Sequence, residues 1–242
     1  MSDLLILAAG STRHLMPYLL SQYCAETKLK CQCEYGRSSS FKSKIEMGAK
    51  FSLFISTSSA HTESLGLSGK LRRCETLGSN RLVLLHRKTQ TIHRNNVLIL
   101  FSDPSLSLGL STTGFDPTIG ASEIIEEVCR AAEIPADELK SRTRIITGGR
   151  EKPNAPMNRN QYGWIMETQA VDLILTIQSN AIDAIDDNPK LKFSKLPLSV
   201  DMVMRYGLGL AKDATNKAEE LFDWLLNNNK ARKILIERGF SF

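Results

Sequence analysis

Short apolar runs of strand length recur along this chain, and they limit its possible folds more than any other feature. Residues 4–8 (LLILA) are wholly apolar and residues 171–176 (VDLILT) mostly so, which is typical of strands buried on both faces. Between such runs lie stretches with apolar residues at helical spacing, for example Ile124, Ile125 and Val128. Strands that alternate with helices predict an α/β protein with mainly parallel sheets.

The same patterns predict the remaining elements. Further strands are expected over residues 30–35, 53–56, 80–87, 97–101, 144–147, 191–196 and 203–210. Further helices are expected from near Pro17, from a turn at residues 36–40 to Gly48, and over residues 161–168, 218–226 and 231–238. In the helix that ends at Gly48, Phe41 and Ile45 should face inward, with Met47 as a further candidate. All apolar runs are far shorter than the roughly 18 residues of a membrane-spanning helix.

Charge is distributed unevenly along the 242 residues. The net charge is +5, with 14 Lys and Arg against 6 Asp and Glu in residues 1–100 and 17 against 20 in the rest. Such a bias fits either a polyanion partner or an anion-binding lobe. No aromatic residues are interleaved with the basic ones, so a nucleic-acid partner is disfavoured. A composition of 42% hydrophobic and 24% charged residues excludes a disordered or fibrous chain.

The five cysteines are an odd number, which excludes complete disulfide pairing within one chain. Cys31 and Cys33 should share one face of a strand, as half of a metal or redox site or as ordinary residues of a reduced protein. We favour the second interpretation, because no further cysteine pair or nearby histidine completes a metal-ligand set. The four histidines lack acidic or cysteine partners at useful spacing, so we assign no catalytic residue and no metal site.

Three predicted strand-to-helix turns carry hydrogen-bond donors. They lie at residues 9–12 (AGST), 38–40 (SSS) and 118–121 (TIGA). A helix N-terminus presents unpaired amides and a partial positive charge, which favours an anion. Serine and threonine at such positions are also common helix N-caps, so spacing alone leaves both interpretations open.

The order of these segments resembles the molybdate-binding, type II periplasmic solute-binding proteins of ABC transporters. The resemblance rests on residues 5–13 (LILAAGSTR), 35–39 (YGRSS), 44–49 (KIEMGA), 160–164 (NQYGW) and 171–176, and on Asp116-Pro117 with Gly120. It extends through Tyr206-Gly207 to the last helices, residues 222–226 and 234–240, and so covers nearly the whole chain.

The resemblance implies a two-lobe fold, each lobe a mainly parallel sheet flanked by helices, joined by two crossover hinges. Residues 1–84 plus 201–242 would form the first lobe and residues 85–200 the second. A tetrahedral oxyanion, molybdate or tungstate, would lie in the cleft between them. No cofactor is implied. The expected partner is an ABC permease, reached by a monomeric protein that is peripheral to the membrane, in the periplasm or at the cell surface.

Individual site residues follow from the same resemblance. In the first lobe, Ser11, Thr12, Ser38 and Ser39 would donate hydroxyl or amide hydrogens to the anion. Amides near Gly120 and Ala121 would contribute from the second lobe. Arg159 could reach the anion or lie on the rim in solvent. Ile177 stands where the molybdate binders carry a tyrosine, and this leaves the identity of the anion open.

Two alternatives remain. One is a cytoplasmic sensor of an oxyanion or small ligand on the same fold, favoured by the five cysteines and by the lack of a recognisable secretory leader at the first residues. A mature exported form would lack a leader as well. The other is an enzyme on a similar fold, for which no clustered acid, base or nucleophile can be nominated.

Overall fold

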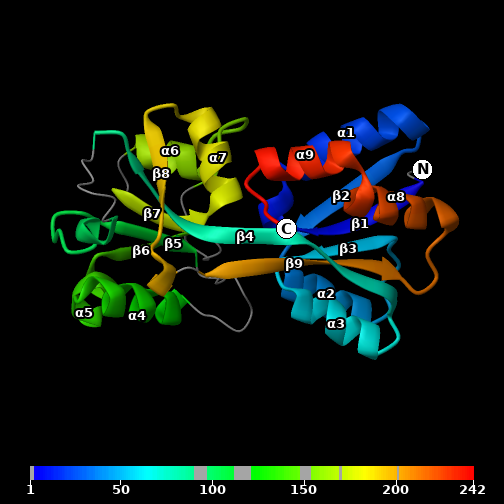
Figure 1. The fold of residues 1–242 in the computed structure, drawn as a ribbon, viewed down its shortest axis with the longest axis horizontal. Helices are drawn as coiled ribbons and strands as arrows, with labels where there is room; N and C mark the ends of the chain where they lie inside the picture. The colour runs from blue at the N-terminus through cyan, green and yellow to red at the C-terminus, as the bar shows by residue number, and fades with distance from the viewer. Residues whose placement is uncertain (1–2, 90–96, 112–120, 148–153, 169–170, 201) are drawn as a thin grey trace. The chain divides into compact units, whose positions relative to one another are not determined.

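The chain divides into two compact units. The computed structural model describes residues 3–89, 97–111, 121–147, 154–168, 171–200 and 202–242 (Figure 1). Unit 1 comprises Met1–Asn80 and Met204–Phe242, and unit 2 comprises Arg81–Val203. The chain passes between them after Asn80 and after Val203, a few residues from the crossings at 84/85 and 200/201 that the resemblance implies.

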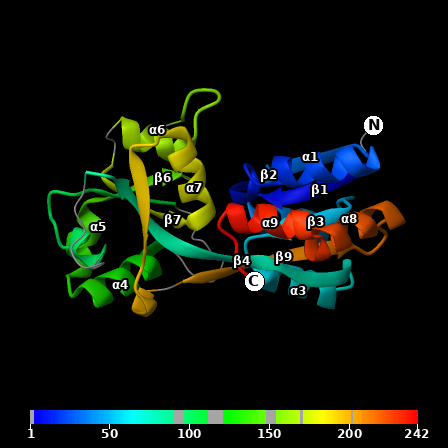
Figure 2. The same cartoon turned by 45° about the horizontal axis from the view of Figure 1, so that its top comes forward.

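Unit 1 is a sheet with helices on both faces. Its strands lie in the order β2-β1-β3-β9-β4, with bounds β1 Leu4–Ala9, β2 Cys31–Gly36, β3 Leu53–Ser56, β4 Leu71–Arg87 and β9 Val203–Ala211. Strand β1 pairs in parallel with β2 and β3, whereas β9 is antiparallel to β3. Helices α1 Met16–Thr27, α8 Asn216–Asn227 and α9 Asn229–Glu237 cover one face, and α2 Ser38–Glu46 and α3 Ser59–Leu67 cover the other (Figures 1 and 2).

Local sequence signals explain where the first helices of unit 1 begin and end. Pro17 lies in the first turn of α1, where its missing N–H has no intrahelical acceptor to lose. Gly48 adopts a φ of +93° directly after α2, a conformation that glycine reaches without strain. Phe41 and Ile45 are buried as predicted, but Met47 is 80% exposed, because the helix has ended before its side chain can turn inward.

Unit 2 is also a mixed sheet between two helical layers. Its strands lie in the order β4-β7-β5-β6, with β8 also pairing β4, and the bounds are β5 Leu108–Ser111, β6 Thr143–Thr147, β7 Leu173–Ile177 and β8 Leu191–Lys195. Its helices are α4 Ala121–Ala132, α5 Ala136–Ser141, α6 Gln161–Glu167 and α7 Gln178–Asp187. Strand β5 is parallel to β6 and β7, and β4 is antiparallel to β7 and β8. All described antiparallel pairs therefore involve β4 or β9. The sequence predicted mainly parallel sheets, and these two strands are the reason that the sheets are mixed.

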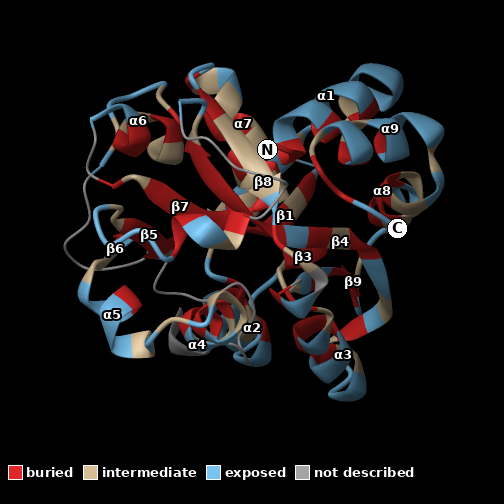
Figure 3. Ribbon diagram, turned by 60° about the vertical axis from the view of Figure 1, so that its left-hand side comes forward, coloured by how far each residue is buried: buried red, intermediate tan, exposed pale blue. Residues whose placement is uncertain are grey.

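Alternate residues of the central strands of unit 2 enter two separate cores. Leu84 and Leu175 pack with Val128 of α4 and Leu139 of α5. Their neighbours along the strands face the opposite side, where Val83 and Ile174 pack with residues of α6 and α7. This is the two-residue period of a strand that is buried on both faces. Figure 3 shows the result as buried strands between helices with exposed outer faces.

Several elements differ from the sequence-based expectation. Residues 97–101, predicted as a strand, include the 3-10 helix Val97–Leu100. A five-residue apolar run shows no period that separates a strand from a buried helical turn, and either conformation buries Val97 and Phe101. The elements β5, α3, α5 and α7 were not predicted. Strand β4 begins at Leu71, nine residues before the predicted start. No helix among the described residues is long and apolar enough to cross a membrane.

We expect His86 to make the stability of unit 2 sensitive to pH. It is fully buried in β4, with Nδ1 3.0 Å from the carbonyl oxygen of Arg87 and Nε2 2.9 Å from Ser194 Oγ. Burial lowers the pKa of His86 below its ordinary value of 6.5. The unfolded chain therefore binds more protons below about pH 6.5, and the stability that neutral His86 contributes is lost as the pH falls through that value.

We expect the free energy of unfolding to fall between pH 7 and pH 5, and to fall less in a His86→Gln variant. Urea denaturation at the two pH values measures both slopes. Equal slopes for the two proteins would show that another group carries the pH dependence.

Candidate functional site

The first two predicted turns meet at one edge of the sheet in unit 1. Parallel strands end at a common edge, so the residues that follow β1, β2 and β3 lie beside one another. These residues are the 3-10 helix Gly10–Thr12, the start of α2 at Ser38, and the turn Thr57-Ser58 before α3. We call this group of three turns the donor edge. Figure 2 shows β1, β2 and β3 side by side in unit 1.

Ser38 is a buried donor at this edge. Its Oγ accepts a hydrogen bond from the backbone N–H of Thr57 at 3.1 Å and lies 3.3 Å from Thr57 Oγ1. The Thr57 amide occupies one acceptor position on Oγ, and the hydroxyl hydrogen of Ser38 can point to Thr57 Oγ1 or to another acceptor. Ser38 is also the first residue of α2, so the amides of the first helical turn lie beside its hydroxyl. Ser39, in contrast, is exposed.

Ser11 is held in place by a residue from the other end of the chain. Its Oγ forms a 2.8 Å hydrogen bond with the hydroxyl of Tyr206, which lies in β9 and is 1% exposed. The sequence analysis included Tyr206 in the resemblance but did not predict this hydrogen bond. A tyrosine in an apolar strand gives no sign of a polar partner 195 residues away. Thr12 is fully buried, and its hydroxyl donates to the carbonyl of Ala9 at 2.7 Å. That hydroxyl therefore stabilises the turn, and only the Thr12 amide remains a candidate donor.

The third turn of the donor edge is held by a buried polar network. Ser56 Oγ accepts a hydrogen bond from the N–H of Ser58 at 3.1 Å and lies 2.9 Å from Nδ1 of His61. All three residues are buried. Ser58 carries no charge, and its backbone N–H is fixed by this hydrogen bond. We infer that this network sets the position of Thr57 and through it that of Ser38.

The predicted donors of unit 2 are only partly described. Gly120 lies outside the described residues, and Ala121 is the first residue of α4. Ile177 ends β7 and occupies the N-cap position of α7 with no side-chain hydrogen bond. Its side chain is buried and apolar, so Ile177 supplies no hydroxyl. The donor that a tyrosine would provide at this position is absent.

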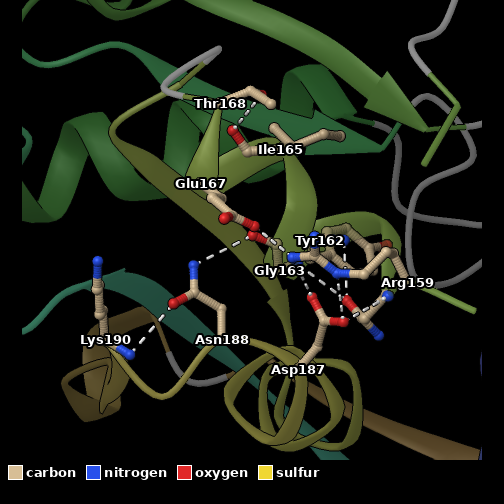
Figure 4. Close-up of polar contacts among 10 residues, drawn as sticks. Arg159, Tyr162, Gly163, Ile165, Glu167, Thr168, Asp187, Asn188 and Lys190 are labelled. Atoms are coloured by element: carbon tan, nitrogen blue, oxygen red, sulfur yellow. Dashed lines mark hydrogen bonds and ion pairs between the residues drawn. The ribbon is translucent and has the colours of Figure 1, made fainter. Parts of the chain in front are cut away.

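Arg159 has partners other than an anion (Figure 4). Its Nε donates to Asp187 Oδ1 at 2.9 Å, and its Nη2 donates to Asp187 Oδ2 at 3.1 Å and also to Glu167. Burial alone would raise the pKa of Asp187, but the guanidinium and the amide of Asn160 outweigh it and hold that pKa below its ordinary value. Arg159 therefore ties α6 to the end of α7. Whether Arg159 also contacts the anion or only lies on the rim stays a prediction.

A second polar cluster in unit 2 escaped the sequence reasoning. The hydroxyl of Tyr162 accepts from Asn180 Nδ2 at 3.4 Å, and the same amide donates to Thr176 Oγ1 at 3.1 Å. Burial raises the pKa of Tyr162, although hydrogen bonds with Thr147, Thr176 and Asn180 act in the opposite direction. The tyrosine is thus neutral. A tyrosine in a helical pattern is usually a core residue, so no sequence signal marks this cluster.

Neutral groups dominate the donor edge. Arg13 and Arg37 flank it in sequence and both are exposed, with the Arg13 guanidinium 5.7 Å from the centre of the Tyr35 ring. Across the described residues, no group of three or more His, Cys, Asp or Glu side chains could hold a metal ion. The chemistry available at this edge is hydrogen-bond donation from hydroxyl and amide groups.

Nearly the whole chain matches a known protein family. Residues 4–241 match the family model of the bacterial extracellular solute-binding proteins. The chain belongs to this family. An uncharacterised protein of Pasteurella multocida is 29% identical over 242 residues, which cover 97% of each chain. Members of this family bind solutes and are not enzymes.

Two solved structures share the fold over almost their full lengths. The periplasmic molybdate-binding protein of Azotobacter vinelandii superposes with a TM-score of 0.75 at 18% identity, covering 99% of each chain. A substrate-binding domain assigned to a molybdenum ABC transporter of Clostridium difficile gives 0.71 at 20% identity, covering 98% of this chain and 97% of its own. These likenesses identify the type II periplasmic binding protein fold.

Proposed function

We propose that this protein binds a tetrahedral oxyanion, molybdate or tungstate, and presents it to an ABC permease for import. Membership of a solute-binding family supports a small ligand and a permease partner. The observation that carries the choice of an oxyanion is the donor edge. There the buried hydroxyl of Ser38 lies at the start of a helix, beside the turn of Ser11. The molybdate-binding protein from Azotobacter vinelandii, which shares the fold, gives independent support for this ligand class.

Neutral donors suit a small dianion. Removing an anion from water is costly, and many short hydrogen bonds must offset the loss of hydration. Amides at a helix N-terminus and fixed hydroxyls provide these bonds without a buried counter-charge. Selection against sulfate would follow from the longer Mo–O and W–O bonds, because a site sized to them contacts a smaller anion poorly. The amides near Gly120 and Ala121 remain predicted contributors.

The five cysteines favour one other candidate, a cytoplasmic sensor that binds the same class of ligand. All five are free thiols in the structure, a state typical of a reducing compartment. We favour the exported solute-binding protein, because the family is one of extracellular binding proteins. A signal sequence encoded upstream of Met1 would decide for export.

Titration calorimetry with molybdate, tungstate, sulfate and phosphate tests the proposed ligand. Binding to the folded state alone stabilises a protein by about 2.7 kcal/mol when the free ligand is at 100 times its Kd. We therefore expect molybdate and tungstate to raise the melting temperature by several degrees and to bind more tightly than sulfate or phosphate. No heat and no thermal shift with any of these anions at millimolar concentration would refute the proposal.

A variant of Arg159 separates the two roles considered for this residue. We expect Arg159→Ala to lower the free energy of unfolding, since the variant leaves Asp187 without its cation. Molybdate affinity should change less than about threefold, because the guanidinium is occupied by carboxylates. Urea denaturation and calorimetry measure the two effects.

Arg130→Ala is the matched control, because Arg130 pairs with Glu127 on the exposed surface of α4 and its loss should cost less stability than the loss of Arg159. A large loss of anion affinity in Arg159→Ala, with little loss of stability, would restore Arg159 to the binding site.

A further inference from the structure

Tyr206 contacts the donor edge from a strand that runs against its neighbour. Strands β1, β2 and β3 end at this edge, whereas β9 is antiparallel to β3, with Ser56 opposite Gly207. The first residues of β9 therefore lie where β3 ends. Tyr206 precedes Gly207 by one residue, and its hydroxyl lies 2.8 Å from Ser11 Oγ. The proposed function assigns the hydroxyl of Ser11 to the anion and leaves Tyr206 without a role.

Packing against the end of the chain fixes the ring of Tyr206. Only 1% of this residue is exposed, and its ring meets that of Phe240 edge to face, with 5.0 Å between the ring centroids and 69° between the planes. Phe240 is buried, and the next residue, Ser241, exchanges two backbone hydrogen bonds with Ser79 of β4, at 2.7 and 2.8 Å. The end of the chain is thus fastened to the sheet, and it holds the phenolic oxygen of Tyr206 against Ser11.

The hydrogen bond between the two hydroxyls can run in either direction. If Tyr206 donates, the hydrogen of Ser11 points to another acceptor; if Ser11 donates, its hydrogen is occupied by the tyrosine. A phenolic O–H is more acidic than that of serine and is the stronger donor, and its oxygen is the poorer acceptor because the ring withdraws lone-pair density. An anion beside Ser11 favours donation by Tyr206 further, because the anion accepts the serine hydrogen and the two hydrogen bonds polarise each other.

We propose that Tyr206 is a positioning residue of the anion site, which donates to Ser11 Oγ and thereby directs the hydrogen of that serine to the bound oxyanion. This role rests on the proposed function, because it requires an anion at the donor edge. Ser11 is half-buried, and its side chain and hydroxyl hydrogen can rotate. A fixed donor on one side restricts both rotations before the anion arrives, so less entropy is lost on binding. Tyr206 acts through Ser11 and needs no contact with the anion.

A double-mutant cycle, measured by titration calorimetry with molybdate, tests this role. Tyr206→Phe removes only the phenolic hydroxyl and keeps the buried ring against Phe240, so we expect the variant to fold. It should weaken binding about fivefold, the effect of one ordinary hydrogen bond. Ser11→Ala should weaken binding about 20-fold, because it removes the donor to the anion itself. The double variant should bind as Ser11→Ala does, since without the serine hydroxyl Tyr206 has nothing to orient.

Tyr23→Phe is the matched control for the loss of a buried phenolic hydroxyl. Tyr23 is a buried residue of α1 in the same unit, and its hydroxyl donates to the backbone carbonyl of Lys217 at 3.5 Å, away from the donor edge. We expect its affinity for molybdate to stay within about twofold of that of the original protein. Circular dichroism and urea denaturation of every variant check that a change of affinity does not come from partial unfolding.

The possible results separate this role from the proposed function. A loss of affinity in Tyr206→Phe that disappears when Ser11 is already alanine supports the role, because a merely structural effect of the tyrosine would persist in both backgrounds. Two results would overturn the role and leave the proposed function intact: unchanged affinity in Tyr206→Phe or in Ser11→Ala, or an equal loss from Tyr206→Phe with and without the serine hydroxyl. A folded original protein that gives no heat with molybdate or tungstate would overturn both.

Discussion

Ser38→Ala is expected to weaken the binding of molybdate or tungstate about 30-fold. The variant removes a hydroxyl that can donate to a dianion, and a hydrogen bond to a charged group contributes about 1.5–3 kcal/mol. It also leaves the N–H of Thr57 without the acceptor that Ser38 Oγ provides at 3.1 Å, which loosens the neighbouring turn. Since about 1.4 kcal/mol corresponds to a tenfold change in Kd, calorimetric titration resolves the effect easily.

Ser40→Ala is the matched control for this prediction. Ser40 lies two residues further along α2 and is exposed, so its hydroxyl should not contribute to binding. Its affinity should stay within about twofold of the original protein, and neither variant should change the secondary structure content. Equal affinities for Ser38→Ala and the original protein would remove Ser38 from the site, and with it the observation that carries the proposed function.

Gly163→Ala is expected to lower the free energy of unfolding by about 2–3 kcal/mol. Gly163 is buried in α6 where this helix packs closely against α7. A Cβ added here would collide with Asp187 Oδ2 and would lie 3.0 Å from the backbone carbonyl oxygen of Ala184. The carbonyl belongs to a helix and cannot move alone, so α6 and α7 must separate, with the usual cost of overpacking a core. Displacement of Asp187 would also weaken its ion pair with Arg159.

Gly48→Ala separates this collision from the general cost of replacing a glycine. Gly48 has no atom within 4 Å of an added Cβ, but its φ of +93° is unfavourable for alanine. We expect a loss of about 1 kcal/mol there from backbone strain alone. Urea denaturation compares the two variants. If Gly163→Ala is as stable as the original protein, the packing of α6 on α7 is looser than the structure shows.

The elements that the sequence predicted well are those whose signals are local. Residues 53–56 form β3 as predicted, because a short apolar run after a glycine-terminated helix has few alternatives. The stop of α2 at Gly48 depends on the conformation of one residue. The 3-10 helix at residues 97–100 was missed because a short apolar run gains the same burial as a strand or as a helical turn.

The first-unit turns of the site were also accessible from the sequence. Serines after predicted strands fall at helix starts wherever the strand and helix boundaries are nearly right, and this holds for Ser11 and Ser38. The proposed ligand class came from resemblance rather than from this geometry. The anion itself stays a proposal, because Ile177 provides no donor where a tyrosine was expected.

By itself, the sequence determined the α/β class, most strand and helix positions, and the serine-bearing turns, because periodicity and turn chemistry depend on neighbours along the chain. Only the tertiary structure decided which polar groups meet. It paired Ser11 with Tyr206 across 195 residues, and it paired Arg159 with Asp187. The physical reason is that a hydrogen bond or ion pair requires two groups within a few ångströms, and that proximity is created by the packing of distant segments rather than by local pattern.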